Sequence, residues 1–496
     1  MAGLADLFES VGFIQSFIIF LVAFLLGLFY LRLPRHLPPG PPGWLGINNV
    51  LALSKEPATA VFTKWANRHG CVFSVRLVGK LYVVLNDLNS IKKALHGQPD
   101  IFSDRNPTKL AKLFGIKGSV SDENGDIWKE HRRFGVGALR SFGMGKQRME
   151  SSINVELMNL LEGFAEQRGK PFDPAHLVEN AVSNIICKIC LGHRFSYKDP
   201  EFAQLLEMVR VQLSYGPTSL LNAFPLLFHT PFYSNLRENN RSINEFFSKK
   251  IKARRETYDE NNIRDMIDLH FAEVERRKRS GKIDDVFDDE SLKGMLFDLF
   301  VAGTDTTSTA LLWFLMYMAR HPDTQRKVQA EIDDVIARSR QPSMSDSPNM
   351  PYTNAVMLEV QRMRPVAPTA LPHYTREQTK LGDYTIPKHT TVVLNIWAVH
   401  HDPATWTEPE KYNPARFLSA DGKSVVQHDT LLNFSTGRRV CMAEKFAKTN
   451  MFIFFVNMLQ RFTFSFPEGK SIPSLEGEGG LVLTPGPFEL CADMRP

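Results

Sequence analysis

A single cysteine near the C-terminal end of the chain sits where a loop passes into a helix. The stretch from Phe434 to Glu444 reads Phe-Ser-Thr-Gly-Arg-Arg-Val-Cys-Met-Ala-Glu, and a helical pattern follows at once. Backbone N–H groups of such a loop can point at the Cys441 sulfur, and the positive end of the helix dipole favours a thiolate. A stabilised thiolate is what a haem iron needs as an axial ligand. We therefore expect Cys441 to bind a haem iron, with a buried structural cysteine as the alternative reading.

Three neighbours of this cysteine suit the same site. Gly437 allows a tight turn with positive φ. Phe434 can lie against the sulfur or against the edge of the macrocycle, and Arg439 supplies a cation for a haem propionate. Each of these residues then has a role in holding one cofactor.

A second polar stretch interrupts a long apolar helix predicted from Lys293 to Ala319. It reads Ala302-Gly-Thr-Asp-Thr-Thr307, and polar side chains in the centre of a protein are costly unless function explains them. Gly303 removes side-chain bulk and Thr306 can bond back to a carbonyl one turn earlier, so we expect a kink with room for a ligand or water. Asp305 beside Thr306 can relay protons. The alternative is an Asp305 ion pair at a purely structural kink.

The N-terminus carries an apolar run of transmembrane length. No charged residue occurs between Glu9 and Arg32, and we expect a membrane helix over about residues 11–31. Acidic residues precede the run, unlike in a cleaved signal peptide, and basic residues follow it, which leaves the bulk of the chain on the cytosolic side. A buried core helix is the alternative reading.

The next segment separates this anchor from the rest of the chain. Residues 37–43 read Leu-Pro-Pro-Gly-Pro-Pro-Gly, which can form neither a helix nor a central strand and should be a stiff spacer. We therefore expect a membrane anchor over 1–36, a proline-rich hinge over 37–43 and a catalytic domain over 44–496.

Composition limits the remaining possibilities. The chain has 496 residues, five cysteines and a net charge of +5 with basic and acidic residues interleaved. The odd, sparse set of cysteines argues for a reducing compartment, and the charge pattern gives no nucleic-acid face. Cys187-x-x-Cys190 has no second pair, which argues against a zinc site.

The cysteine stretch resembles the haem-ligand loop of the cytochromes P450, usually written Phe-x-x-Gly-x-Arg-x-Cys-x-Gly, with Ala443 in place of the last glycine. Further motifs follow the family's order: a Trp-x-x-x-Arg pair, the acid–alcohol pair, and a Glu-x-x-Arg helix tied to a later Pro-x-Arg-Phe stretch. Phrases such as Met350-Pro-Tyr-Thr-Asn-Ala-Val-Met-Leu-Glu359 are most similar to animal microsomal P450s of family 2. The resemblance covers essentially the whole chain.

The resemblance implies roles for individual residues. Trp128, Arg132, His373 and Arg439 would hold the haem propionates, and Phe434 and Ala302 would contact the haem, whose iron Cys441 would bind. Asp305 and Thr306 would deliver protons. Glu359, Arg362 and Arg416 would support the fold, while Lys129, Arg133, Arg438 and Lys445 would form a basic face for an acidic reductase.

The family also implies a fold and a reaction. The fold would be mainly α with a small β region, around a haem b. The enzyme would insert one oxygen atom from O₂ into a lipophilic fatty acid, steroid or xenobiotic, by hydroxylation or epoxidation. Electrons would come from NADPH through NADPH-cytochrome P450 reductase, with cytochrome b5 as a second donor, at the endoplasmic reticulum membrane. The other readings are a haem-thiolate isomerase or dehydratase of lipid peroxides, which tends to lack the acid–alcohol pair, and a non-catalytic haem- or lipid-binding membrane protein.

Two further predictions concern the substrate cavity and the surface. By resemblance, the cavity is lined by residues 102–117, 206–232, 297–302, 366–371 and 480–483, which are largely apolar. The aromatic, proline-punctuated segment Phe224–Tyr233 either dips into the membrane interface or covers the core, and the sequence favours neither. Residues 71–85 alternate about a Gly-Lys turn and predict a β-hairpin.

Overall fold

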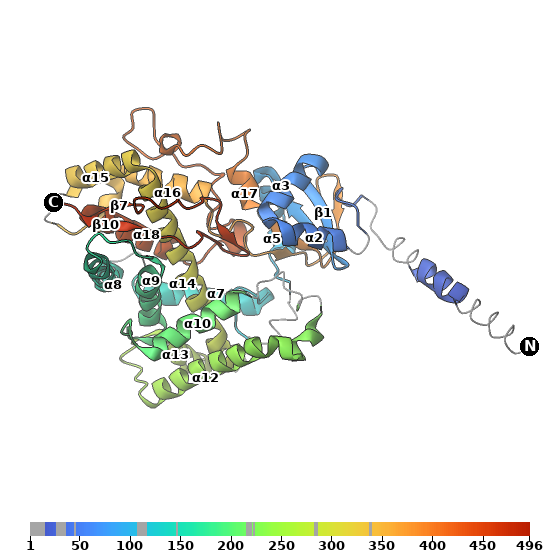
Figure 1. Cartoon of the computed structure of the whole chain (residues 1–496). Coiled ribbons are helices and arrows are strands. Elements are labelled where there is room, and N and C mark those ends of the chain that lie inside the picture. The colour runs from blue at the N-terminus through green and yellow to red at the C-terminus, as the bar shows by residue number, and fades with distance from the viewer. Residues whose placement is uncertain are drawn as a thin grey trace, which may run out of the picture.

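The computed structural model describes residues 15–25, 36–43, 46–106, 117–144, 147–214, 221, 224–281, 286–336 and 340–496. It is mainly helical with four small sheets (Figure 1), which confirms the predicted fold class. Within the predicted membrane helix, residues 15–25 are described and form a short apolar helix. Residues 11–14 and 26–31 of that prediction lie outside the described residues.

One long helix, α14 (Asp289–Arg320), organises the core. It begins at a capping box in which the Asp288 carboxylate accepts from the Ser291 N–H. Among the described residues it is the one helix long and apolar enough to cross a membrane, but 61% of its apolar window is buried inside the protein. It is therefore a core helix of the protein.

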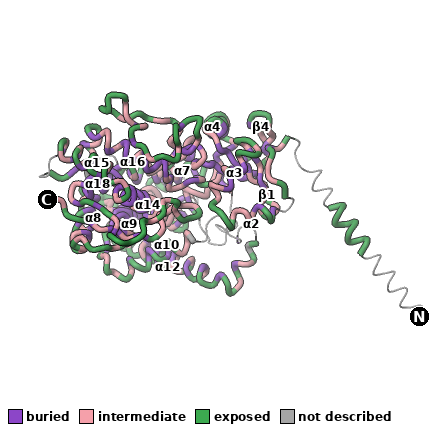
Figure 2. The backbone as a smooth tube through the Cα atoms, turned by 45° about the horizontal axis from the view of Figure 1, so that its top comes forward, coloured by how far each residue is buried: buried purple, intermediate pink, exposed green. Residues whose placement is uncertain are grey.

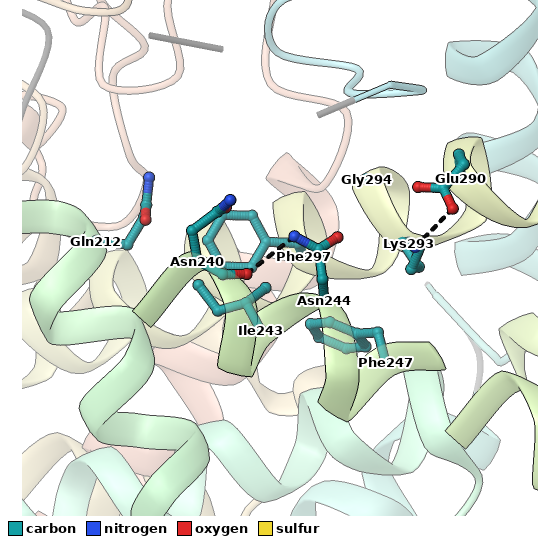
Figure 3. Close-up of a pocket in the computed structure, with 9 residues that line it drawn as sticks. All are labelled: Gln212, Asn240, Ile243, Asn244, Phe247, Glu290, Lys293, Gly294 and Phe297. Carbon is teal, nitrogen blue, oxygen red and sulfur yellow. Dashed lines mark hydrogen bonds and ion pairs between the residues drawn. The ribbon is translucent and has the colours of Figure 1, made fainter. Parts of the chain in front are cut away.

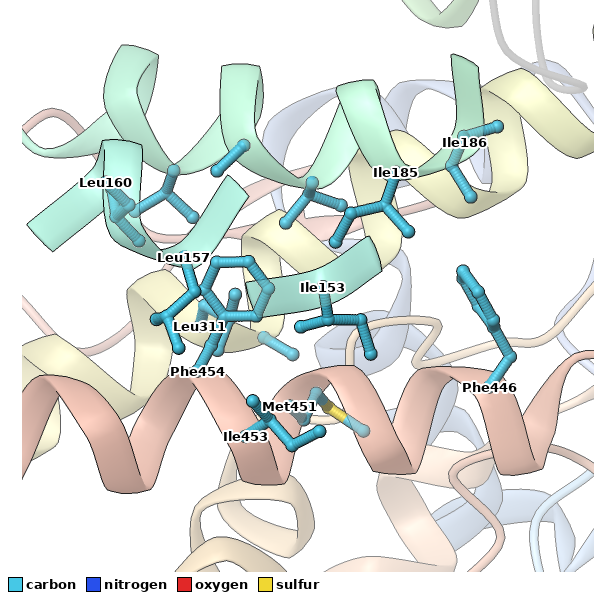
Figure 4. Close-up of a cluster of buried hydrophobic side chains, with 14 of the residues drawn as sticks. Ile153, Leu157, Leu160, Ile185, Ile186, Leu311, Phe446, Met451, Ile453 and Phe454 are labelled. Atoms are coloured by element: carbon cyan, nitrogen blue, oxygen red, sulfur yellow. The ribbon is translucent and has the colours of Figure 1, made fainter. Parts of the chain in front are cut away.

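Three helices pack their apolar side chains around α14. They are α8 (Gln147–Glu166), α9 (Ala175–Leu191) and α18 (Glu444–Arg461). Figure 4 shows Ile153 and Leu157 of α8, Ile185 of α9 and Phe454 of α18 meeting around Leu311. Figure 2 shows buried backbone concentrated where these helices meet. This dense core fixes the position of both chemical motifs, because one lies on α14 and the other leads directly into α18.

Gly303 allows close helix packing. The sequence had predicted that it would instead help to open room for a ligand or water. A Cβ atom at Gly303 would lie 2.5 Å from Cδ1 of Ile186 on α9. The missing side chain therefore lets α9 approach α14 closely, and it does not open room for a ligand on that side. The helix runs unbroken from Asp289 to Arg320 through the polar stretch.

The largest sheet has four strands in the order β1-β2-β6-β3. The antiparallel pair β1 (Val72–Leu77) and β2 (Lys80–Leu85) confirms the predicted hairpin. Its two-residue turn is Val78-Gly79, one residue earlier than the predicted Gly-Lys turn, and both residues have the positive φ of a tight hairpin. Strand β6 (Thr391–Leu394) runs parallel to β2 and pairs with β3 (His373–Tyr374), so the sheet positions His373.

The other elements surround this framework. The helices are α2 (Ile47–Lys55), α3 (Ala58–His69), α4 (Leu88–Leu95), α5 (Pro99–Phe102), α7 (Gly125–Ser141), α10 (Pro200–Ser214), α12 (Ser234–Glu256), α13 (Met266–Arg279), α15 (Pro322–Ile336), α16 (Pro351–Met363) and α17 (Ile396–His400), with 3₁₀ turns η1 (Pro225–His229), η2 (Pro231–Tyr233), η3 (Met344–Asn349), η4 (Pro414–Phe417) and η5 (Gly437–Arg439). The short strands are β4 (Thr379–Leu381), β5 (Tyr384–Ile386), β7 (Phe462–Ser465), β8 (Glu478–Gly479), β9 (Leu483–Thr484) and β10 (Cys491–Met494).

A buried ion network ties α16 to the segment before the cysteine loop, as the sequence predicted. Glu359 accepts from Arg362 Nε at 2.7 Å and from Arg416 Nε at 3.0 Å. The Glu359 and Arg362 side chains are fully buried, and Arg362 also donates to the carbonyl oxygen of His400 at 2.7 Å. The His400 ring in turn accepts from the Leu432 N–H at 2.8 Å. The network thus reaches the segment that leads into the cysteine loop.

We predict that Glu359→Gln lowers the free energy of unfolding by about 3–5 kcal/mol, because it leaves two buried guanidinium groups without their carboxylate. Denaturant unfolding of the purified protein measures this change. The matched control is Glu408→Gln, which removes an exposed pair with Lys411 and should cost at most about 1 kcal/mol. Equal effects of the two substitutions would contradict a structural role for the network.

Candidate functional site

The cysteine loop folds as a tight turn that only glycine fits at one position. The Cys441 N–H donates to the Phe434 carbonyl oxygen at 3.0 Å and closes the loop. Gly437 has φ +76°, and a Cβ atom there would lie 3.0 Å from the Leu95 carbonyl oxygen. This confirms the predicted positive φ at Gly437, where both backbone strain and the Leu95 contact exclude a side chain.

The local environment does not by itself make Cys441 a thiolate. The Ala443 N–H and the Arg132 guanidinium both favour the thiolate, as the loop-to-helix position predicted, but desolvation outweighs them and raises the pKa of the Cys441 thiol. The Ala443 N–H therefore acts on the Cys441 thiol in the expected direction, and desolvation opposes it. A coordinating metal deprotonates a thiol outright, so the sulfur is suited to a ligand role.

The unusual Ala443 is explained by its backbone conformation. It is the residue before α18 and has φ −102°, which an L-amino acid adopts without strain. Its side chain packs against the main core. A glycine is therefore not required at this position.

Helix α7 carries the Trp128–Arg132 pair and brings it against the cysteine loop. The Arg439 guanidinium carbon lies 3.9 Å from the centre of the Trp128 ring, a close cation–π contact. Arg132 Nη2 donates to the carbonyl oxygen of Val440 at 2.6 Å, one residue before the cysteine. The structure thus brings three of the predicted site residues, Trp128, Arg132 and Arg439, to one place beside Cys441.

Arg439 also fastens the segment before α7 to the cysteine loop. Its Nε donates to Ser103 O at 2.8 Å, its Nη1 to Val120 O at 3.1 Å, and its Nη2 to Glu123 O at 2.6 Å. Burial, together with the nearby cation of Arg105, lowers the pKa of Arg439 to about 9. The sequence identified the charge of this arginine but not its role in holding the neighbouring backbone.

His373 lies buried on β3 with one ring nitrogen engaged. Its Nδ1 lies 2.8 Å from the Phe102 carbonyl oxygen, which can only accept, so Nδ1 carries a proton. Its buried Nε2 has no hydrogen-bond partner among the described residues. Burial, followed by the nearby Arg105, lowers the pKa of His373 well below its usual value.

Arg105 is a site residue that sequence reasoning missed. Its side chain is buried and Nη1 donates to the carbonyl oxygens of Leu371 at 2.7 Å and Pro372 at 2.9 Å. Its Nε has no partner among the described residues, and burial lowers its pKa to about 10. The only sequence signal was a single arginine after Phe102-Ser-Asp, without a diagnostic spacing.

These residues form a buried cationic cradle whose donors suit an anionic group. Three guanidinium groups, of Arg105, Arg132 and Arg439, influence one another's ionisation. Trp128 Nε1 and Arg105 Nε are buried donors without a partner within the described part of the chain. His373 Nε2 is also buried and unpartnered there, but because Nδ1 carries the proton of the neutral ring, Nε2 donates only when the ring is doubly protonated. Buried donors normally find acceptors. A haem, with two propionates and an iron that a cysteine can bind, fits this donor set.

The acid–alcohol pair lies one helical turn after Ala302 on α14. Thr306 Oγ1 donates to the Ala302 carbonyl oxygen at 2.6 Å, which confirms the predicted bond to the preceding turn. Burial, together with the Glu179 carboxylate, raises the pKa of Asp305 to about 6. No ion pair joins Asp305 to another described residue, which does not favour the structural alternative. Ala302, one turn before Thr306, is exposed.

The other cysteine pair has no partners for a metal. Cys187 and Cys190 are both buried in α9, as predicted for structural residues. Within the described ranges, no group of three or more His, Cys, Asp or Glu side chains could hold a metal ion. Cys187 and Cys190 therefore carry no metal site within the described ranges.

Known proteins are similar to this chain over most of its length. The family model described as cytochrome P450 matches residues 38–492. The chain is 38% identical to cytochrome P450 2U1 of Mus musculus, across 96% of this chain and 94% of that protein. It is 37% identical to cytochrome P450 2D4 of Rattus norvegicus, across 94% of each. The buried cradle, the lone cysteine and these matches together show that the chain belongs to the cytochrome P450 family of haem monooxygenases, and to its animal family 2 type.

Proposed function

We propose that this protein is a membrane-bound haem-thiolate monooxygenase that oxidises a lipophilic substrate with electrons from NADPH. The observation that carries the proposal is the pair of buried donors, Trp128 Nε1 and Arg105 Nε, that have no partner among the described residues in the same site as the thiol of Cys441. Such donors suit an anionic group.

The residues have distinct roles in this proposal. Cys441 would bind the haem iron through its sulfur, and the side chains that would hold the propionates are those of Trp128, Arg132, His373, Arg439 and Arg105. Phe434 packs beside the cysteine loop and Ala302 contacts the cofactor from α14. The bound haem supplies dioxygen activation. The overall reaction converts R–H, O₂, two electrons and two protons into R–OH and water, or an alkene into an epoxide.

Asp305 and Thr306 manage the protons of this reaction. A carboxyl group with a pKa of about 6 can both take and give a proton near neutral pH. The Thr306 hydroxyl is held by its bond to Ala302 O and can order a water beside Asp305. This pair is also what disfavours the isomerase or dehydratase alternative, which needs no proton delivery to oxygen.

Electrons reach the site from NADPH-cytochrome P450 reductase, and cytochrome b5 can supply the second. Lys129, Arg133, Arg438 and Lys445 are all exposed near α7 and the cysteine loop. Lys129, Arg133 and Arg438 pair with surface carboxylates, which are weak contacts that an acidic partner can replace. These four cations form the proposed docking face.

The protein works at the endoplasmic reticulum membrane, with residues 1–36 as a single-pass anchor, 37–43 as a hinge and 44–496 as a cytosolic catalytic domain. Two large apolar side chains of the segment 224–233, Leu226 and Phe232, are more than 80% exposed. In α2, Ile47 and Leu51 are also exposed. In Figure 1 the start of α12, which follows this segment, and α2 lie on the same side of the molecule. We assign that side to the membrane surface.

We predict that Thr306→Ala uncouples the enzyme. NADPH oxidation continues, but a smaller share of the electrons appears in oxidised substrate and more appears as released hydrogen peroxide, because the hydroxyl that orders the proton donor is lost. Parallel assays of NADPH, product and peroxide in the reconstituted enzyme measure this share. Thr306→Ser retains the hydroxyl and should stay coupled; full coupling in Thr306→Ala would remove the proposed role.

We predict that Asp305→Asn stabilises the protein at neutral pH. The folded-state pKa of Asp305, about 6, lies above its ordinary value of 3.8, so the native protein loses stability as pH rises between these values. The variant escapes this loss and should gain about 3 kcal/mol at pH 7 and little below pH 4. Unfolding at several pH values tests this, with exposed Asp383→Asn as the control. A gain independent of pH would contradict the assigned cause.

A further inference from the structure

His131 is a buried histidine that lies directly before the cradle residue Arg132 on α7. Its side chain is only 1% exposed. Its Nδ1 lies 2.8 Å from Oε2 of Glu123, and its Nε2 lies 2.7 Å from the carbonyl oxygen of Val286. The ring therefore joins three segments of the chain, which are α7, the loop before α7 and the residues that lead into α14.

Both nitrogens of this ring face oxygen atoms that accept hydrogen bonds. A backbone carbonyl oxygen can only accept, so Nε2 carries a proton. An ionised carboxylate can also only accept, so either Nδ1 carries a second proton or Glu123 is itself protonated. In both cases His131 and Glu123 together hold one proton more than a neutral imidazole and a carboxylate. Loss of that proton leaves two acceptors facing each other and breaks one of the two hydrogen bonds.

Glu123 connects this contact to Arg439. Its second carboxylate oxygen, Oε1, accepts from the Gly118 N–H at 2.7 Å, so the side chain closes the loop of residues 118–123. Carbonyl oxygens of this loop, at Val120 and Glu123, accept from the Arg439 guanidinium at 3.1 and 2.6 Å. The position of Arg439 in the cradle therefore depends on the shape of this loop.

The other end of the contact, at Val286, lies beside a firmly packed part of the core. The Asp288 carboxylate caps the first turn of α14. Phe247 of α12 and Phe297 of α14 line one small pocket (Figure 3), so α12 packs against the first half of α14. His131 therefore ties the loop to a segment whose position is set by other contacts.

The remaining charged groups around this contact lie on α7, α12, α13 and the start of α14. On α13, burial lowers the pKa of His270 to about 4, so its ring is uncharged at neutral pH. The other charges form pairs, which are Arg277 with Glu130, Lys117 with Asp288, and Arg255 with Asp289.

Two groups that touch the same loop also titrate near neutral pH. Asp298 of α14 accepts from Ser119 and Ser121, and burial raises its pKa to about 6. Burial lowers the pKa of Arg439 to about 9. An experiment on His131 therefore has to compare variants that retain both of these groups.

We propose that His131 is a positioning residue that shares a buried proton with Glu123 and thereby holds Arg439 in the cradle. While the pair keeps its proton, both hydrogen bonds of the ring form and the loop is closed. When the pair loses the proton at higher pH, one bond breaks and the loop loosens around Arg439. This inference rests on the proposed function, in which Arg439 binds a haem propionate.

The test measures how fast haem leaves the full-length haem-loaded protein for an excess of apomyoglobin, at about pH 6.5 and about pH 8.5. Glu123→Gln keeps the shape of the side chain, and its amide can donate to a neutral His131, so both bonds form without the extra proton. His131→Gln places an amide there that can donate on one side only. His193→Gln is the matched control, because His193 is an exposed histidine just beyond α9.

We expect the parent and Glu123→Gln to release haem at similar rates at about pH 6.5. At about pH 8.5 the parent should release it roughly tenfold faster than Glu123→Gln, the effect of losing one charge-assisted hydrogen bond. His131→Gln should be fast at both pH values, and His193→Gln should follow the parent. Identical pH profiles for the parent and Glu123→Gln, or slow release from His131→Gln, would overturn the proposal.

Hydrogen exchange provides a second readout that does not involve haem release. At one pH, backbone amides of residues 118–123 should exchange faster in His131→Gln than in Glu123→Gln, and equal exchange would contradict the proposed loop closure. A parent that shows thiolate-ligated haem but none of these differences would refute only the role of His131. A failure of thiolate ligation would instead refute the proposed function.

Discussion

The contact between the Arg439 guanidinium and the Trp128 ring holds the two halves of the proximal site together. At 3.9 Å it joins the cysteine loop to α7, and the other donors of Arg439 fasten the backbone at Ser103 and Glu123 to the same point. Burying a cation here is costly, which the lowered pKa of Arg439 expresses. An anionic cofactor relieves that cost. The same residue thus links folding of the cysteine loop to cofactor binding.

Helix α14 also combines close packing with a buried polar group that lowers stability. It is the best-packed helix of the core, and Gly303 lets α9 approach it closely. It nevertheless holds Asp305 in surroundings that disfavour the charged form of its carboxyl group. A sequence selected for stability alone would place an apolar residue there. The retained carboxyl group is consistent with the strained polar sites that catalysis requires.

The sequence predicted the features that depend on local motifs. It did not predict the features that depend on contacts between residues distant in the sequence. Turn residues predicted the hairpin at 72–85 and the positive φ of Gly437. The spacing of residues on a helix predicted the hydrogen bond of Thr306, and sequence motifs predicted the Glu359 network. Gly303 has its packing role because Ile186, which is distant in the sequence, lies against it. Arg105 is held in the site by the carbonyl oxygens of Leu371 and Pro372, which are also distant in the sequence. Desolvation by the surrounding elements raises the pKa of the Cys441 thiol, although the residue itself is exposed, and no local pattern contains this effect.

The central claim is that Cys441 binds the haem iron as a thiolate, and carbon monoxide binding to the reduced protein tests it most directly. The native protein should show the strongly red-shifted Soret band typical of thiolate-ligated haem. Cys441→Ser should retain haem through the cradle of Trp128, Arg132, Arg439, His373 and Arg105 but lose that band. A native spectrum without the red-shifted band, or the same band in Cys441→Ser, would contradict the assignment of this cysteine.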